Sequence, residues 1–546
     1  MLMKKTTTAA LAACGLLCVL LTGWFWRRQA VAPHPARLSS PAPAAATAAS
    51  TAVPTVTSRT DPAVRDLLAR LQRLLGRRDI RHNEAVLTFK DDAAYARFLA
   101  RAAQAGLTIV GRLDALRSVR VRYTDLAALQ LDAAQHPSDY ADLSGNYLFG
   151  VPPIPAKEAR DAVNQVPFRN SALAFLGATG DRSQWGRGVT IAVLDTGVAL
   201  ADATFGTGRV QTLDVGLGVF PGTASDDGHG TSVASLAAGL AADAPGVAPA
   251  ARVLSIRVTD TSGTSDIYTL SQAIVAATDA GARVINISLG GYATNALLDA
   301  AITYAANNGA VIVAAAGNDQ AAQLAWPAAD PRVISVAAVD LAEQQVTFSN
   351  SGAQLQLSAP GYAVQTAWLD NSRVYVSGTS ASAPLVAGAI AAVMSQNSAL
   401  TAAQAAQILT QTANDVGAPG TDPNYGHGIL NLAWAMNATN RAYTDTAVSS
   451  HYYDAATGQM DFVLQNRGGA PVSSLSLAVT SGAYTTYYDV TSLDAGETKL
   501  VTVPVDAAAL KASGQIRFST TLINPIGTVD QVPTNNTRAS VLTATK

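Results

Sequence analysis

Val189-Thr190-Ile191-Ala192-Val193-Leu194-Asp195-Thr196-Gly197 is the stretch that decides the fold of this 546-residue chain. A short apolar run ends in a carboxylate and a glycine, as a buried strand of a parallel sheet does. Four similar runs follow: Val253–Val258, Val284–Ser288, Val311–Ala315 and Val333–Val339. Segments with helical spacing, such as 267–279 and 297–307, lie between several of them. The alternation predicts an α/β region at 165–440, with a parallel sheet covered by helices on both faces.

Two further regions flank this α/β region. From 61 to 153, an amphipathic helix is followed by short segments in the order β-α-β-β-α, which predicts a small α/β sandwich. Beyond Tyr443 the helical spacing gives way to period-two alternation between turns, for example in Gln459–Gln465 and Thr498–Val505. This pattern predicts an all-β sandwich over 445–546.

The first 60 residues have the composition of a targeting segment and a linker. Lys4 and Lys5 precede 18 apolar or small residues, 9–26, and two arginines follow. We expect either an export signal or an uncleaved anchor over 1–28, and the sequence does not decide between them. Residues 29–60 are rich in Ala, Pro, Thr and Ser, which predicts a flexible linker. The protein is therefore expected to be secreted or in the cell envelope, with membrane contact only through its N-terminal segment.

The charge is unevenly distributed along the chain. The formal net charge is −2, so no basic excess points to nucleic acid as a partner. Residues 59–122 hold 14 basic and 7 acidic side chains, a net of +7, whereas residues 170–440 hold 8 arginines and 18 acids, a net of −10. The basic segment could dock on the acidic one, or the two could be unrelated solvated surfaces.

Three short segments combine the residue types that nucleophilic catalysis needs. Asp195 ends an apolar strand, His229 stands between two glycines, and Ser380 lies in Ser377-Gly378-Thr379-Ser380-Ala381-Ser382-Ala383-Pro384 at the start of a helix. A serine hydroxyl becomes a good nucleophile when an imidazole takes its proton, and a carboxylate fixes the tautomer of that imidazole. Each segment alone is also typical of a helix cap or a turn. The three together, in this order, predict a catalytic triad.

Here the sequence resembles the subtilisin family of serine peptidases over residues 170–440. Asp195, His229 and Ser380 match the triad positions of that family. Ala314-Ala315-Ala316-Gly317-Asn318 resembles its Ala-Ala-Gly-Asn motif. The resemblance implies that the Asn318 amide and the Ser380 backbone N–H stabilise the oxyanion, and that Gly317 lies in the substrate site.

The resemblance also implies where an extended substrate binds. Ser288-Leu289-Gly290-Gly291 is similar to the segment that pairs with the substrate strand and walls its first specificity pocket. Ser262-Gly263-Thr264 is similar to the opposite edge, so that a peptide would lie between two strands. Ala381 and Leu385 depart from the family pattern, which often has Met and His there. We expect both to face the interior of the helix, with altered packing and retained chemistry.

Subtilisin-like precursors carry an inhibitory propeptide of the β-α-β-β-α kind, so the resemblance implies this role for residues 61–153. Asn146-Tyr147-Leu148-Phe149 would be the tail that enters the active site, and self-cleavage would fall between about Phe149 and Asn170. The propeptide would then be a partner of the enzyme, in addition to polypeptide substrates. An adaptor domain that stays attached is the alternative. The C-terminal sandwich resembles adhesion-type domains, which implies no ligand.

The chemistry implied is hydrolysis of peptide bonds through an acyl-enzyme, with no cofactor required. A structural calcium ion stays open, because no acidic cluster has the spacing of a calcium loop and only their location makes Asp202 and Asp243 candidates. Two alternative functions on the same fold are a non-catalytic surface binding protein and a peptide ligase. An aspartic peptidase is disfavoured, because the chain has a single Asp-Thr-Gly.

Overall fold

A computed structural model describes residues 69, 72, 77–152, 165–200, 203–218 and 228–544. The expected signal or anchor, the linker and every leucine of the expected helix in 61–75 lie outside these residues. Within the described ranges, no helix is both long enough and apolar enough to cross a membrane. We refer below to the N-terminal region (77–152), the central region (165–440) and the C-terminal region (445–544).

The central region is built on a seven-stranded parallel sheet with the order β12-β11-β10-β9-β5-β7-β6. Its strands are β5 (Thr190–Asp195), β6 (Val210–Leu213), β7 (Arg252–Arg257), β9 (Val284–Ile287), β10 (Val311–Ala315), β11 (Ile334–Val339) and β12 (Leu357–Pro360). The five strands read from apolar runs are confirmed. The edge strands β6 and β12 were not expected, since they are short and carry polar residues.

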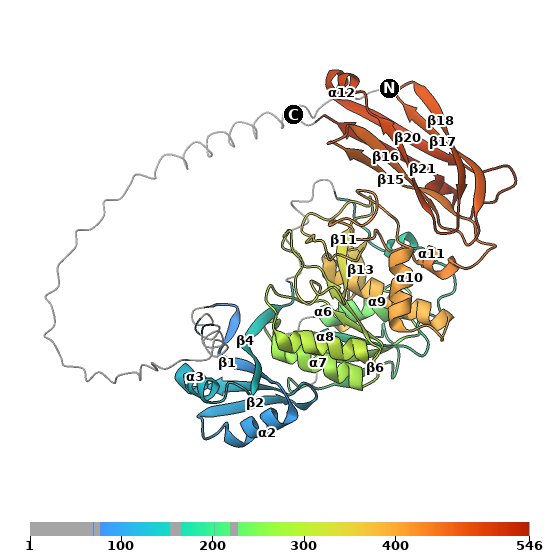
Figure 1. The fold of residues 1–546 in the computed structure, drawn as a ribbon. Coiled ribbons are helices and arrows are strands. Elements are labelled where there is room, and N and C mark those ends of the chain that lie inside the picture. The colour runs from blue at the N-terminus through green and yellow to red at the C-terminus, as the bar shows by residue number, and fades with distance from the viewer. Residues whose placement is uncertain are drawn as a thin grey trace, which may run out of the picture. The chain divides into compact units, whose positions relative to one another are not determined.

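Helices cover both faces of this sheet, as predicted. They are α5 (Ala172–Phe175), α6 (His229–Ala238), α7 (Ile267–Asp279), α8 (Ala296–Asn307), α9 (Thr379–Gln396), α10 (Ala402–Gln411) and α11 (Leu432–Asn437). Alternate residues of β5 face two separate cores. Ile191 and Val193 pack with α6 and α9, whereas Ala192 and Leu194 pack with α7 and α8. Figure 1 shows α7 and α8 side by side. A two-stranded hairpin, β13 (Val364–Ala367) and β14 (Arg373–Val376), precedes α9.

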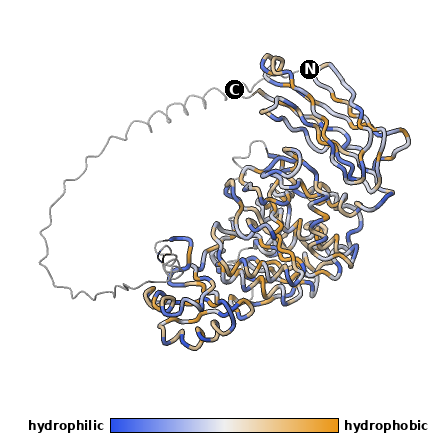
Figure 2. Tube along the Cα trace, viewed as in Figure 1, coloured by the Kyte–Doolittle hydropathy of each residue, from blue (hydrophilic) through white to orange (hydrophobic). Residues whose placement is uncertain are grey.

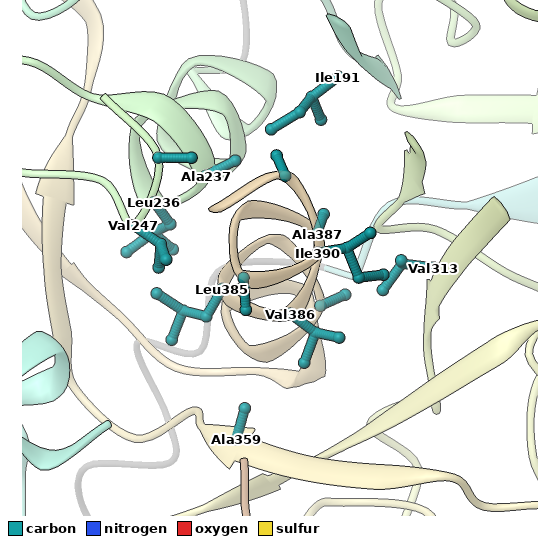
Figure 3. Packing of buried hydrophobic residues seen from close by; sticks show 14 of the residues in the cluster. Ile191, Leu236, Ala237, Val247, Val313, Ala359, Leu385, Val386, Ala387 and Ile390 are labelled. Carbon is teal, nitrogen blue, oxygen red and sulfur yellow. The ribbon is translucent and has the colours of Figure 1, made fainter. Parts of the chain in front are cut away.

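The central helix of the fold is α9. All of its residues from Thr379 to Val393 are buried, which suits its apolar and small side chains. Figure 3 shows Leu385, Val386 and Ile390 projecting from this helix toward side chains of the surrounding elements. Ala381 and Leu385, the two departures from the family pattern, are both buried, as expected.

The N-terminal region is an antiparallel sheet with two helices, and the predicted order lacked one strand. The elements are β1 (Ile80–Phe89), α2 (Asp92–Arg101), β2 (Leu107–Leu113), β3 (Ser118–Tyr123), α3 (Leu126–Gln135) and β4 (Tyr140–Gly150). The sheet order is β2-β3-β1-β4, and β4 continues the sheet onto β8 (Thr264–Asp266) of the central region. Strand β4 escaped prediction because it carries Asp142, Ser144 and Asn146 in place of a clear apolar alternation.

The C-terminal region consists of two antiparallel sheets, as predicted for a sandwich. One has the order β15-β16-β19 and the other β18-β17-β20-β21. The elements are β15 (Thr446–Asp454), β16 (Gln459–Asn466), β17 (Val472–Ser481), β18 (Tyr484–Leu493), β19 (Thr498–Pro504), α12 (Ala507–Ser513), β20 (Gln515–Ile523) and β21 (Thr537–Thr543). Figure 2 shows hydrophobic and hydrophilic residues mixed along these strands, consistent with one buried and one solvated face. The short helix α12 was not expected.

Asp415, which follows α10, makes the stability of the fold depend on pH. The side chain is buried, and this burial, with a smaller contribution from Asp422, raises the pKa of Asp415 to about 6. Because the pKa is raised on folding, the contribution to stability is complete below about pH 4 and is lost as the pH rises through 6. We therefore expect Asp415→Asn to stabilise the protein by about 2 kcal/mol at pH 8 and to change little at pH 4.

Thermal unfolding midpoints at the two pH values measure this effect. An equal shift of the midpoint at pH 4 and pH 8 would contradict the role of Asp415 ionisation.

Candidate active site

Asp195 and His229 come together at the carboxyl end of strand β5. Asp195 is the last residue of β5, and His229 is the first residue of α6. Both are buried, and His229 Nδ1 lies 2.8 Å from Asp195 Oδ1. A carboxylate accepts hydrogen bonds only, so Nδ1 carries the hydrogen and the basic lone pair of the neutral ring is on Nε2. This arrangement can take up a proton at Nε2 and stabilise the resulting imidazolium.

The other residues of the two motifs hold this pair in place. The backbone N–H of Gly230 donates to Thr196 Oγ1 at 3.0 Å, and that of Ala199 donates to Thr231 Oγ1 at 2.9 Å. A Cβ atom on Gly230 would stand 2.3 Å from the carbonyl oxygen of Gly197. Only glycine therefore lets α6 approach the turn after β5 closely enough for the His229–Asp195 hydrogen bond to form.

Ser380 is the second residue of α9, where the backbone N–H groups of a helix are unpaired. Its Oγ donates to the backbone carbonyl of Ser288 at 3.2 Å, and Ser288 Oγ donates in turn to the Ser380 carbonyl at 3.2 Å. Pro384 leaves the Ser380 carbonyl free to accept this second hydrogen bond. It stands four residues after Ser380 and has no N–H for the helical bond to that carbonyl. The proline thus allows the backbone of Ser380 to be tied to the segment after β9.

Asn318 follows β10, and its side chain contacts Thr379, the neighbour of Ser380. Its Oδ1 accepts from the backbone N–H and from the hydroxyl of Thr379, each at 2.9 Å. Because the amide oxygen is held on this side, the NH₂ group is directed away from Thr379 and can donate to a ligand. The sequence did not single out Thr379 for this orienting contact.

A cleft of about 300 Å³ lies beside these residues. The predicted substrate residues Ser288, Leu289, Gly290 and Gly317 line it together with Asn318 and Thr379. Tyr292 is also part of the wall, and burial together with a hydrogen bond to Asp319 raises its pKa to about 12, so its hydroxyl stays protonated. The structure therefore brings the predicted substrate segment next to Ser380 and Asn318.

The end of the N-terminal region runs along this cleft as an added strand, and Gly150, Val151 and Pro152 form part of its wall. Gly150 exchanges two backbone hydrogen bonds with Gly290, at 3.1 and 3.2 Å, and the Val151 N–H donates to the Gly263 carbonyl at 3.0 Å. The segment thus runs between the two edges predicted to hold a substrate, as in β-augmentation. The expected tail, 146–149, was too short. The segment in the cleft extends to Pro152, and Asn146 instead accepts a hydrogen bond from the Tyr268 N–H at the start of α7.

A charged contact next to the cleft joins the same two regions. Asp266 caps α7, is almost completely buried, and is paired with Arg81 of the N-terminal region. Arg120 Nη1 lies 3.6 Å from the same carboxylate, and its guanidinium stands over the Tyr268 ring. Two arginines from the basic segment thus compensate a buried acid of the central region.

The structure describes one of the two calcium candidates. Asp243 pairs with Arg373 at 3.0 Å on the surface, and Asp202 lies outside the described residues. In the described part of the chain, no three His, Cys, Asp or Glu side chains are grouped as ligands for a metal ion.

The chain is similar in sequence to known proteins. The sequence model of the subtilase family of peptidases matches residues 186–428. The thermostable alkaline protease of Halalkalibacterium halodurans is 34% identical over 257 residues, which are 47% of this chain and 69% of that protein. Subtilisin Savinase of Lederbergia lenta is 33% identical over 263 residues, 46% of this chain and 93% of that protein. A solved structure of a serine-to-alanine mutant of the protease domain of PatA matches 46% of this chain and 94% of its own, with 28% identity and a TM-score of 0.42.

The residues matched by the family model include the Asp195–His229 pair and Ser380. The chain belongs to the subtilase family and is a serine-type endopeptidase that acts on polypeptides.

Proposed function

We propose that Ser380 is the nucleophile of this endopeptidase, His229 its general base and Asp195 the residue that orients His229. The 2.8 Å contact between His229 and Asp195 is the observation that carries this assignment, because it places the basic lone pair on Nε2. Before attack, the Ser380 hydroxyl turns from the Ser288 carbonyl to that nitrogen. Oγ then bonds to the substrate carbonyl carbon, and its proton passes to His229.

The carbonyl oxygen becomes an oxyanion, which the Asn318 NH₂ and the Ser380 N–H stabilise. When the peptide C–N bond breaks, His229 gives its proton to the leaving nitrogen and an acyl ester remains on Ser380. Water, activated by His229, then hydrolyses the ester and restores the hydroxyl. The extended substrate lies between Gly263 and the segment 288–290, where backbone groups bind every sequence alike and side-chain pockets add preference.

We further propose that the enzyme is made as an exported precursor. The segment at 148–152 takes up the backbone hydrogen bonds of Gly263 and Gly290 that a substrate needs, and the Arg81–Asp266 pair helps to hold the N-terminal region there. Residues 1–28 would direct export, as a cleaved signal or an anchor, and 445–546 would form a separate adhesion-type domain. The precursor becomes active when the chain is cut between about Phe149 and Asn170 and the N-terminal region leaves.

The test uses a chain in which residues 156–162 are replaced by the recognition sequence of a site-specific protease, which we call the switchable chain. After the cut, a fluorophosphonate probe is expected to label the switchable chain on Ser380 and a fluorogenic peptide to be hydrolysed. The same chain with Ser380→Ala should show neither reaction. Absence of labelling in the cut chain with Ser380 present would refute the proposed mechanism.

The charged contact at Asp266 predicts how firmly the cleft is closed. In the uncut full chain, Arg81→Ala with Arg120→Ala leaves a buried carboxylate without a cation whenever the N-terminal region is docked. Loss of one side of a buried pair costs about 2 kcal/mol or more, so the probe should label Ser380 about 30-fold faster.

The matched control is Arg77→Ala, because Arg77 pairs with Asp79 inside the N-terminal region and both side chains are partly exposed. It should leave the labelling rate unchanged. Equal rates for the double variant and the wild type would show that the contact does not close the cleft.

A further inference from the structure

The strand pairing in the cleft fixes which peptide bond of the chain's own tail faces the nucleophile. Gly150 and Gly290 form an antiparallel pair that exchanges both backbone hydrogen bonds. Moving two residues forward on one strand and two residues back on the other places Pro152 opposite Ser288. The Ser288 carbonyl is the group that accepts the hydrogen bond from Ser380 Oγ. Pro152 also lines the cleft together with Asn318 and Thr379. The carbonyl presented to Ser380 is therefore that of Pro152.

Pro152 can form only part of the hydrogen-bonded pair with Ser288. In an antiparallel sheet, the residue opposite Ser288 donates its N–H to the Ser288 carbonyl, and a proline has no N–H to give. That carbonyl instead receives the hydroxyl of Ser380 at 3.2 Å. A hydroxyl has one hydrogen, so this bond holds the proton that Ser380 would have to pass to His229 before attack.

The peptide bond between Pro152 and Pro153 is hard for this site to cleave. Residue 153 is also a proline, so the nitrogen to be expelled belongs to a tertiary amide. Its ring Cδ occupies the place where a secondary amide carries only hydrogen, on the nitrogen that His229 has to protonate. Loss of effective protonation of a leaving group costs about 10²-fold or more in rate. The tail thus presents a bond that this site attacks badly.

We infer that the bond which the docked segment Leu148–Pro152 presents to Ser380, the bond between Pro152 and Pro153, is one that the enzyme cannot readily cleave. The inference rests on the proposed function of Ser380 and concerns its regulation. The first cut of the wild-type chain then falls at another bond, after the strand has slipped or left the cleft. Pro153, which makes the bond a tertiary amide, therefore delays the release of the active enzyme.

The test compares single substitutions in the full chain, followed by intact mass and N-terminal sequence over time. Pro153→Ala restores a secondary amide and should generate a product that starts at residue 153 about 10²-fold faster than the wild type. Pro152→Ala returns the N–H to Ser288 but keeps the tertiary amide, so it should stay as slow as the wild type at this bond. Pro155→Ala, two residues further on, is the matched control and should also behave like the wild type. Adding Ser380→Ala to Pro153→Ala should abolish the cut.

Three results would overturn the inference. They are rapid wild-type cleavage between Pro152 and Pro153, a Pro153→Ala chain that is cut there no faster than the wild type, and acceleration by Pro155→Ala equal to that of Pro153→Ala. Labelling of the cut switchable chain by the fluorophosphonate probe distinguishes a failure of this inference from a failure of the proposed function. If Ser380 reacts there and Pro153→Ala has no effect, only the inference about the tail fails.

Discussion

Alanine at Ser380, at His229, or at both positions should lower the kcat of the cut switchable chain by about 10⁶-fold in all three cases, a magnitude known from a subtilisin. Under the proposed mechanism the two residues act as one unit. Without the imidazole the hydroxyl keeps its proton, and without the hydroxyl the imidazole has no nucleophile to activate. The double variant should therefore be no slower than either single one. Initial rates on a fluorogenic peptide, with active-site titration of the wild type, provide the measurement.

Ser382→Ala is the matched control for this series. Ser382 lies two residues further along α9, is also buried, and donates to the carbonyls of Ala359 and Pro360, away from the cleft. Its loss should leave kcat within a few-fold of wild type. Additive losses in the double variant, or a comparable loss with Ser382→Ala, would contradict the assignment of Ser380 and His229 as a coupled pair.

Asn318→Asp should lower kcat by about 10²- to 10³-fold and leave KM nearly unchanged, again a magnitude known from another subtilisin. Aspartate has the shape of asparagine and can still accept both hydrogen bonds from Thr379. It replaces the NH₂ donor with an oxygen, so the oxyanion loses one partner and gains a repulsive charge. The effect belongs to the transition state, because the charge on the substrate oxygen develops only there.

Thr379→Val tests how much the orientation of the Asn318 amide contributes, apart from its stabilisation of the oxyanion. The valine removes one of the two hydrogen bonds to Asn318 Oδ1 and keeps the backbone N–H bond. We expect a loss of less than about 10-fold in kcat, since a neutral hydrogen bond contributes about 1 kcal/mol. A rise in KM with an unchanged kcat for Asn318→Asp would show that the amide binds the ground state and does not stabilise the oxyanion.

The elements that sequence reasoning found are those that their own side chains determine. Strand β10 and helix α7 occupy the predicted residues. A local apolar run specifies β10, and the amphipathic pattern that follows the N-cap Asp266 specifies α7. Strand β8 could not be predicted. Its three residues, Thr264–Asp266, pair with β4, which lies more than 100 residues earlier in the chain.

The candidate site divides in the same way. Asp195, His229, Ser380 and Asn318 lie in motifs whose residue types alone suggest chemistry, and the structure brings them to one end of the sheet. The effect of Pro384 on Ser380 follows only when the free carbonyl is seen to accept Ser288 Oγ. The position of Pro152 opposite Ser288 depends on a strand register between distant segments. No local pattern contains that register, which is why the expected tail ended three residues too early.

If substrates bind between Gly263 and Gly290 as proposed, this two-edged cleft also limits which proteins can be cut. A chain in that slot uses its backbone N–H and C=O groups on both sides, so it has to give up any helix or sheet bonds of its own over about five residues. A folded target therefore reacts only through its locally opened states, and each 1.4 kcal/mol of opening free energy slows its cleavage about tenfold. Sites in loops and in unfolded chains are degraded first, and the same requirement protects well-packed proteins around the enzyme.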